Sequence, residues 1–333
     1  HPETQCLRFL QRFADGDKRR AMMTRLPPLK VAVAGVVLLV VVAQGCKGSP
    51  YREVEIDLAA DSSRQLSEQQ IGDDKVFRFS VAAMQSARDT YAGYSQLVVH
   101  IGDLLGWRST FVQRRTYREV NDLLVGGRLD AALVCPGGYA DLLRRAPGSI
   151  EVVVVPVIDG KSTYQSFIIV PAASSASTLK DLAGKRFAFT DELSLPGRAY
   201  ALHLLREMHE DPAHFFGSTL FTHSHDRSVE AVANGFSDGA SVDSLVYEHL
   251  VVEKPDLAAK TRVIHRSPPF GIMPLVASTR LSPTVRTHLR TILLGLDSDP
   301  AAVGIMQALR IERFVVPSPT LYDTAIEIVA GGR

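Results

Sequence analysis

Polar side chains stand at both ends of the segment from position 222 to 244. His225 opens a short stretch with helical periodicity, Gly235 ends that stretch, and an apolar strand follows that finishes at Asp243. Imidazole and carboxylate groups can donate and accept hydrogen bonds, and groups at the open ends of an α/β unit are suited to a ligand cleft. We therefore predict that His225 and Asp243 face a ligand, while Gly235 and Asp238 serve the turn at the opposite end.

Four further hydroxyl side chains stand at or near predicted helix starts. They are Ser86, Thr90, Thr190 and Ser194. Unpaired backbone N–H groups and a partial positive charge allow a helix start to hold an anion without a metal, and a hydroxyl adds a neutral donor. The alternative is that each hydroxyl only caps its helix. Asp243 could accept a hydrogen bond from a protonated oxyanion or from a ligand amine.

Two other kinds of site have weaker support. His214, His223 and His225 fall close together, but no Cys or paired carboxylate completes a usual set of metal ligands. The tripeptide at 224–226 holds the residue types of a catalytic triad, yet neighbours in sequence point in different directions, whereas a triad must converge in space. No metal, no cofactor and no enzymatic activity are predicted.

The focal segment has a counterpart 108 positions upstream. With this shift, Tyr117 matches His225, Gly127 matches Gly235, Asp130 matches Asp238, and Tyr139 matches Tyr247. A period that long exceeds the roughly 20 to 50 residues of solenoid repeats, so the pattern indicates two similar lobes. The alternative is a common helix-to-strand connection that uses Gly as its cap.

Strands and helices alternate from position 76 onward. Strand patterns occupy 76–81, 110–112, 131–134, 152–157, 164–170, 187–189, 262–265 and 275–277. Helical patterns occupy the stretch from Tyr94 to a stop at Gly106, 201–208, 245–252, 283–296, 300–309 and 322–330. This alternation predicts an α/β protein with mainly parallel sheets.

The first 46 residues are interpreted as an export signal. Residues 1–21 are expected to lie upstream of the working protein, and Met22 and Met23 are plausible starts. Basic residues then precede an apolar run, Val31 to Ala43, that is shorter than the about 20 residues needed to span a bilayer. The ending Ala43-Gln44-Gly45-Cys46 resembles the lipobox of bacterial lipoproteins, which implies lipidation at Cys46. The polar stretch 47–74 is predicted to be a flexible tether.

The charge and cysteine content of the chain argue against nucleic acid and zinc as binding partners. The 333 residues carry a net charge of +1, and no basic stripe with interleaved aromatics is present, so nucleic acid binding is not predicted. Three scattered cysteines form no disulfide or zinc pattern. Cys135, which follows a buried strand, is interpreted as a small core residue.

From about Val76 to the end, the chain resembles the periplasmic solute-binding proteins of phosphate, phosphite and phosphonate ABC transporters. The matching segments are 84–90, Tyr117 with Gly127 and Asp130, 136–139, 224–232, 242–244 and 268–271. The resemblance implies the two-lobed type II periplasmic-binding-protein fold, with lobe 1 at 75–163 and 266–333, lobe 2 at 164–265, and a ligand cleft between the lobes.

The same resemblance implies a function and a set of contacts. A monomeric, lipid-anchored protein would capture a small phosphorus oxyanion and deliver it to a membrane permease. Tyr117 and Tyr139 would line the first-lobe side of the cleft, the loop around Ser194 would hold the oxyanion, and His225 and Asp243 would complete the pocket. One departure is the run Ser194-Leu195-Pro196-Gly197, which lacks two hydroxyls that phosphonate-binding members carry. Alternatives are a sensor lipoprotein and a binding protein for another small anion.

Overall fold

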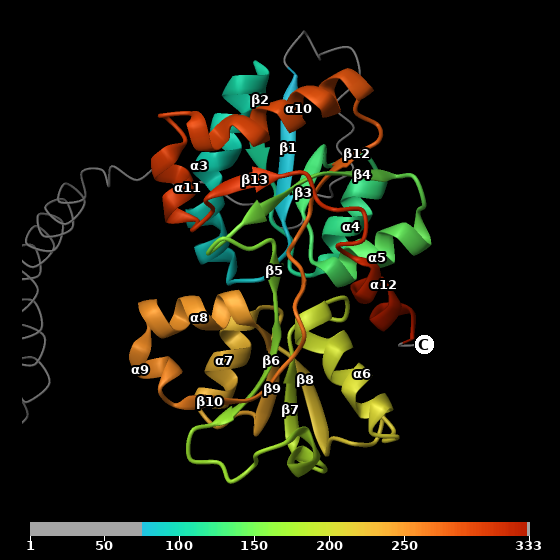
Figure 1. The fold of residues 1–333 in the computed structure, drawn as a ribbon, viewed down its shortest axis with the longest axis vertical. Coiled ribbons are helices and arrows are strands. Elements are labelled where there is room, and N and C mark those ends of the chain that lie inside the picture. The colour runs from blue at the N-terminus through green and yellow to red at the C-terminus, as the bar shows by residue number, and fades with distance from the viewer. Residues whose placement is uncertain (1–74, 332–333) are drawn as a thin grey trace, which may run out of the picture. The chain divides into compact units, whose positions relative to one another are not determined.

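A computed structural model describes residues 75–331, which form two α/β lobes (Figure 1). The signal, tether and lipidation predictions, including Cys46, fall on residues 1–74 and lie outside this range. No helix within 75–331 is both long and apolar enough to cross a membrane.

The first lobe is built on a six-stranded sheet. Its strands in spatial order are β13 (Arg313–Val315), β4 (Ile150–Val157), β12 (Leu275–Ser278), β3 (Ala131–Leu133), β1 (Val76–Val81) and β2 (Arg108–Phe111). Strands β1, β2 and β3 are parallel, whereas β12 is antiparallel to both of its neighbours and β13 to β4.

The second lobe is built on a five-stranded sheet with the same plan. Its strands in spatial order are β10 (Thr261–Arg266), β6 (Ser166–Pro171), β9 (Gly239–Asp243), β7 (Arg186–Phe189) and β8 (Ser218–Phe221). Here β6 is the reversed strand, and β7 is parallel to β8 and β9. Each sheet therefore contains one reversed strand that enters it from the other lobe, β12 in the first and β6 in the second, and the first sheet has β13 as a further reversed strand at its edge.

Helices cover both faces of each sheet. In the first lobe they are α3 (Ala87–Leu105), α4 (Tyr117–Val125), α5 (Pro136–Arg145), α10 (Pro283–Gly295), α11 (Val303–Ala308) and α12 (Asp323–Ala330). In the second lobe they are α6 (Tyr200–Glu207), α7 (His225–Ala233), α8 (Ser244–Glu253) and α9 (Pro255–Ala258). Three short turns, η2 (Leu179–Leu182), η3 (Leu195–Ala199) and η4 (Leu296–Ser298), complete the set.

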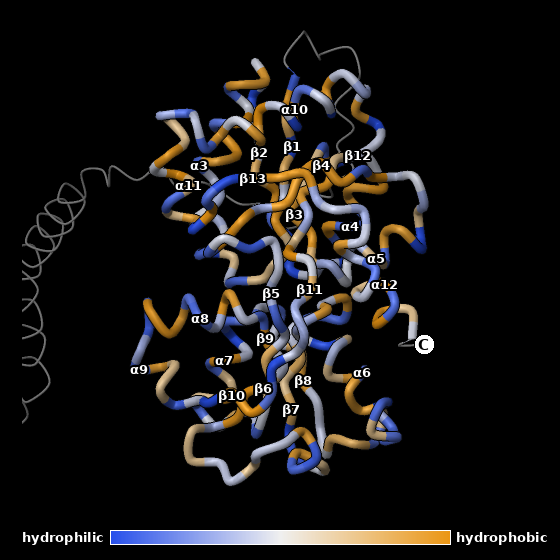
Figure 2. The backbone as a smooth tube through the Cα atoms, in the orientation of Figure 1, coloured by the Kyte–Doolittle hydropathy of each residue, from blue (hydrophilic) through white to orange (hydrophobic). Residues whose placement is uncertain are grey.

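Alternate residues of the strands enter separate cores, as the two-residue period of a strand requires. In β3, Ala131 and Leu133 pack with α3 and α10, while Ala132 packs with α4 and α5 on the other face. In β7, Phe187 and Phe189 pack beneath α6. Hydrophobic segments accordingly run through both sheets in Figure 2. Because both faces of each sheet are buried, the sequences of the central strands are continuously apolar and do not alternate with polar residues.

Two chain crossings join the lobes. Strand β5 (Thr163–Tyr164) pairs antiparallel with β11 (Phe270–Gly271) to form a short ribbon between the sheets. The Ser267 N–H donates to the Ser166 carbonyl oxygen at 2.9 Å, and this hydrogen bond connects the two crossings. The predicted lobe limits at 163/164 and 265/266 fall beside this ribbon.

The predicted α/β class with mainly parallel sheets is confirmed, and so are the predicted strands and helices. Their ends are displaced by a few residues, except that α3 begins at Ala87, seven residues before Tyr94. Three strands were missed. β8 is a four-residue edge strand that is mostly exposed, and β11 and β13 have only two and three residues, so none of them carries a clear alternating pattern. The helix predicted after Ser194 begins as the single π-type turn η3 before continuing as α6.

The internal repeat is visible in hydrogen bonds. The Arg78 N–H donates to Asp130 Oδ2 at 2.7 Å, and 108 positions later the Arg186 N–H donates to Asp238 Oδ2 at 2.9 Å. Helices α4 and α7 begin at the matched Tyr117 and His225 and have nine residues each. Asp238 therefore serves a turn inside the second lobe, as the sequence predicts.

Candidate ligand-binding site

Tyr117 and His225 meet where the two lobes touch. Each is the first residue of its helix, α4 in the first lobe and α7 in the second, and both side chains are buried. Tyr117 Oη lies 3.5 Å from His225 Nε2. The internal repeat thus brings its two matched residues face to face across the lobe contact.

Hydrogen bonds fix the state of the His225 ring. Its Nδ1 accepts from the Asp243 N–H at 3.0 Å and lies 3.0 Å from Thr190 Oγ1. Because the backbone N–H must donate, Nδ1 carries no proton and the neutral ring carries its proton on Nε2. Burial lowers the pKa of His225 to about 3. His225 is therefore neutral and supplies a hydrogen bond but no positive charge.

The predicted hydroxyl groups are engaged within the protein. Ser86 Oγ accepts from the Asp89 N–H at the start of α3, and Ser194 Oγ accepts from the Gly197 N–H at 3.0 Å. Thr190 Oγ1 also lies 3.2 Å from Ser228 Oγ. Ser86 and Ser194 thus cap their helices, which is the alternative that the sequence left open.

The loop after Ser194 has few free donors. Leu195 is fully buried, and its N–H donates to Cys135 Sγ of the first lobe at 3.4 Å. Pro196 has no N–H, and its carbonyl accepts from Ser166 and Ser241. This helix start therefore offers an anion little in the arrangement observed.

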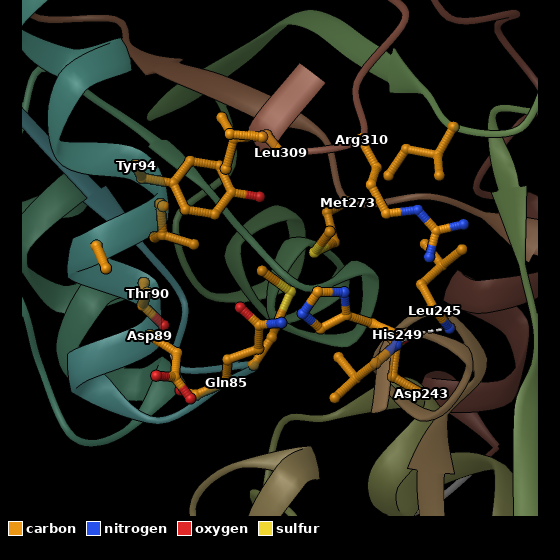
Figure 3. A pocket seen from close by; sticks show the side chains of 17 residues that line it. Gln85, Asp89, Thr90, Tyr94, Asp243, Leu245, His249, Met273, Leu309 and Arg310 are labelled. Atoms are coloured by element: carbon orange, nitrogen blue, oxygen red, sulfur yellow. Dashed lines mark hydrogen bonds between the residues drawn. The ribbon is translucent and has the colours of Figure 1, made fainter. Parts of the chain in front are cut away.

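A cavity of about 290 Å³ lies beside this contact, between α3 and α8 (Figure 3). Thr90 and Asp243 line it, whereas the other six predicted residues do not: Ser86, Tyr117, Tyr139, Thr190, Ser194 and His225. The first-lobe wall comes from α3, Met273 and the end of α11, and the second-lobe wall from α8. A ligand in this cavity would touch both lobes.

Several polar lining residues were not predicted from the sequence. They are Gln85, Asp89, Tyr94, His249 and Arg310. Tyr94 lies four residues beyond the predicted Thr90 on α3, which was a usable signal. His249 lies one turn beyond Leu245 on α8. Arg310 follows α11 in a loop, and nothing in the sequence distinguished it.

Asp243 is the most perturbed group at the cavity. It caps α8, with one oxygen accepting from the Leu245 and Val246 N–H groups at 2.8 and 3.3 Å. Its other oxygen has no hydrogen-bond partner among residues 75–331. Burial raises the pKa of Asp243 to about 7, and the nearby Glu248 charge adds to the shift. This carboxyl can accept from a ligand or, when protonated, donate to it.

The remaining charges around the cavity are mixed. Arg310 is paired with Asp159 at 2.8 Å, and Asp89 is exposed at the rim. Burial, with a contribution from Asp243, raises the pKa of Tyr94 to about 12, so its hydroxyl stays protonated. In Figure 3 the Tyr94 hydroxyl and the His249 ring point into the cavity. The Tyr94 hydroxyl, the His249 imidazole and the paired Arg310 thus surround the acidic Asp243.

Tyr139 lies away from the cavity lining. Its ring packs against Tyr322 of α12 with centroids 5.0 Å apart, and it remains half-buried. The sequence could not foresee this contact, because Tyr322 is far along the chain.

Metal chemistry finds no support in the described part of the chain. No group of three or more His, Cys, Asp or Glu side chains within 75–331 is arranged to hold a metal ion. His214 is exposed and paired with Asp211, far from the buried His225.

The fold and the cavity between its lobes can now be compared with known proteins. A family model described as "ABC transporter, phosphonate, periplasmic substrate-binding protein" matches residues 79–322, which is well over half of the chain. The chain belongs to this family. An extracytoplasmic location follows from membership in this phosphonate-binding family.

Individual relatives agree with that assignment. The phosphate-import protein PhnD of Mycolicibacterium smegmatis is 25% identical over 219 residues, which cover 62% of this chain and 68% of the relative. A binding component of a phosphonate ABC transporter from Pseudomonas aeruginosa has the same fold, with a TM-score of 0.73, 20% identity, and coverage of 78% and 87%.

A second solved structure holds a ligand. PhnD1 of Prochlorococcus marinus, in complex with methylphosphonate, aligns with the present chain with a TM-score of 0.69 and 20% identity. The alignment covers 77% of the present chain and 98% of PhnD1. These structural neighbours confirm the predicted type II periplasmic-binding-protein fold.

Proposed function

We propose that this chain is the extracytoplasmic solute-binding component of an ABC transporter. It captures a small phosphorus oxyanion, either phosphate, phosphite or a phosphonate, between its two lobes and delivers it to the permease. The observation that carries the proposal is the cavity, whose walls come from α3 in one lobe and α8 in the other. A ligand that bridges two lobes favours their closed arrangement, which is what a permease can recognise.

Thr90 and Asp243 are the proposed direct contacts from the predicted set. Asp243 would accept a hydrogen bond from a protonated oxygen of the ligand, or donate one when it is itself protonated. The accepting mode favours a ligand that carries a proton at neutral pH, and the donating mode favours a ligand oxygen that carries none. Tyr94 and His249 would donate hydrogen bonds to the remaining oxygens.

The other predicted residues are proposed to hold the lobes in position around the ligand. Tyr117, Thr190 and His225 form the buried contact between the lobes, and Ser86 and Ser194 fix the helix starts beside it. Tyr139 supports the first lobe through its packing on Tyr322.

The site of anchoring and the absence of catalysis belong to the same proposal. Cys46, at the end of the apolar run, would carry the lipid and keep the monomeric binding protein near its permease. The ligand would be released unchanged, because transport requires no chemistry on it. Incorporation of a labelled fatty acid into the wild-type protein but not into Cys46→Ser would support the anchor.

A thermal-shift panel tests the ligand class. Phosphate, phosphite, methylphosphonate, aminoethylphosphonate and sulfate would each be added to the purified protein. A ligand that binds only the folded state at 100 times its Kd stabilises it by about 2.7 kcal/mol. We expect at least one phosphorus compound to raise the Tm and sulfate to have a smaller effect. No response to any phosphorus compound would exclude the proposed ligand class.

A further inference from the structure

Two helices of the first lobe begin against carboxylates of the second lobe. The Ser86 N–H at the start of α3 donates to Asp226 Oδ2 at 3.0 Å, and the Tyr117 N–H at the start of α4 donates to Asp191 Oδ2 at 3.2 Å. Asp226 and Asp191 are 4% and 2% exposed. Both contacts therefore cross the lobe boundary in a place sheltered from water.

The chemistry of these contacts is that of anion binding. A helix start carries a partial positive charge and unpaired N–H groups, and a carboxylate placed there is stabilised. Asp226 is itself the second residue of α7, so the starts of α7 and α3 converge on one carboxylate. Neither carboxylate has a salt-bridge partner among residues 75–331. Asp191 also accepts from the Leu193 N–H of its own lobe at 2.8 Å, so the interlobe bond is one of two to its carboxylate.

Asp226 is hydrogen-bonded through only one of its two carboxylate oxygens. Its Oδ1 is buried and has no hydrogen-bond partner in the described part of the chain, and buried polar atoms without a partner are uncommon in native proteins. Its Oδ2 contact lies in the other lobe. The residue therefore contributes its interaction only when the lobes are together.

Further bonds cross the boundary at the same place. The His225 N–H donates to the Met84 carbonyl at 2.9 Å, in addition to the Leu195 contact with Cys135. Neither Asp191 nor Asp226 lines the cavity. The lobes are thus held together by groups that a ligand in the cavity need not touch.

We propose that Asp191 and Asp226 are built-in anionic bridges that bring the lobes together without ligand and thereby set ligand affinity from outside the cavity. Each carboxylate occupies a helix start that an oxyanion could otherwise bind, which also keeps free anions away from these two positions. The effect on affinity rests on the proposed function, whereas the closure of the empty protein does not. A ligand would then enter through a minor open state.

Small-angle scattering of the ligand-free protein tests the closure directly. Asp191→Ala and Asp226→Ala are expected to enlarge the radius of gyration, because each removes an interlobe bond. Asp226→Asn keeps an oxygen acceptor and should fall between wild type and Asp226→Ala. Asp238→Ala is the matched control, since its carboxylate makes the same kind of backbone contact, to the Arg186 N–H, but within one lobe.

Binding kinetics separate a bridging role from a general loss of structure. With the best phosphorus compound from the thermal-shift panel, each Ala variant should associate faster, because more molecules are open, and dissociate faster still. The dissociation rate should rise by up to about tenfold per carboxylate. The Kd should rise by less, because the same bridge is also lost from the closed empty protein. Asp238→Ala should change neither rate. A damaged fold would slow association instead.

The outcomes are distinct. Unchanged scattering in both Ala variants, or the same change in Asp238→Ala, would overturn the bridging role whatever the ligand proves to be. Expanded Ala variants in a protein that binds no phosphorus compound would support the bridges and refute the proposed function. Expanded variants that also associate more slowly than wild type would contradict entry through an open state.

Discussion

Gly137 offers the sharpest way to perturb the lobe contact without touching either core. It is the second residue of α5 in the first lobe and faces the loop 190–197 of the second. A Cβ at this position would lie 2.2 Å from the Leu193 carbonyl oxygen and 2.9 Å from the Leu195 nitrogen. Both are backbone atoms and cannot rotate away. Gly137→Ala should therefore force the lobes apart at this point.

The free-energy cost of Gly137→Ala can be estimated from the overpacking that the new methyl group causes. Extra methyl groups in a tightly packed contact cost about 1 to 3 kcal/mol, while Ala is favoured over Gly inside a helix by roughly 0.5 to 1 kcal/mol. The first lobe alone is thus not destabilised, and the cost falls on the closed arrangement. The empty protein can relieve the clash by opening, whereas the closed complex cannot, so ligand affinity should fall by at most about 150-fold, the equivalent of about 3 kcal/mol.

Titration calorimetry with a bound phosphorus compound measures this change. Gly138→Ala is the matched control, because a Cβ there would meet only the Asn121 side chain at the ordinary distance of 3.6 Å. The Tm of the ligand-free Gly137→Ala protein should change little by comparison with its Kd. Equal affinities for the two Ala variants would show that closure at Gly137 is not needed for binding.

Three further predictions concern single side chains. His225→Ala and Asp243→Ala should each weaken binding far more than His223→Ala, measured as Kd; similar losses from all three would mean that the cleft is misplaced. Because the folded protein holds the Asp243 proton up to about pH 7, the free energy of unfolding should fall as pH rises from about 4 to 7, by about 4 kcal/mol at most. Asp243→Asn should flatten that slope in urea titrations, and an unchanged slope would refute the assignment. Asp238→Ala should lower the free energy of unfolding by about 1 kcal/mol through loss of its bond to the Arg186 N–H, with Kd unaltered.

The architecture could be predicted because local patterns agree with it. Strong strand signals, helix stops at Gly, and the repeat from Tyr117 to His225 all reflect interactions that lie close in sequence or recur in it. The reversed strands β6 and β12 arise at the crossings, where residues around Pro268 lead the chain from one sheet to the other. Strands as short as β13 have too few residues to show a period.

The site was harder to predict because its details depend on contacts between the lobes. The sequence marks Ser194 as a helix start and Cys135 as small and buried, but not that the Leu195 N–H meets the thiol. That contact, with Pro196, leaves the predicted anion loop with few free donors. Asp243 could be foreseen because it ends a buried strand at the open edge of its sheet.

Binding between the lobes is tested most directly by a crystal structure of the protein with the phosphorus compound that raises its Tm most. We expect density for the ligand in the cavity between α3 and α8, with an oxygen within hydrogen-bond distance of Asp243 and a second contact to Thr90 or Tyr94. A ligand bound elsewhere, or touching one lobe only, would contradict capture between the lobes.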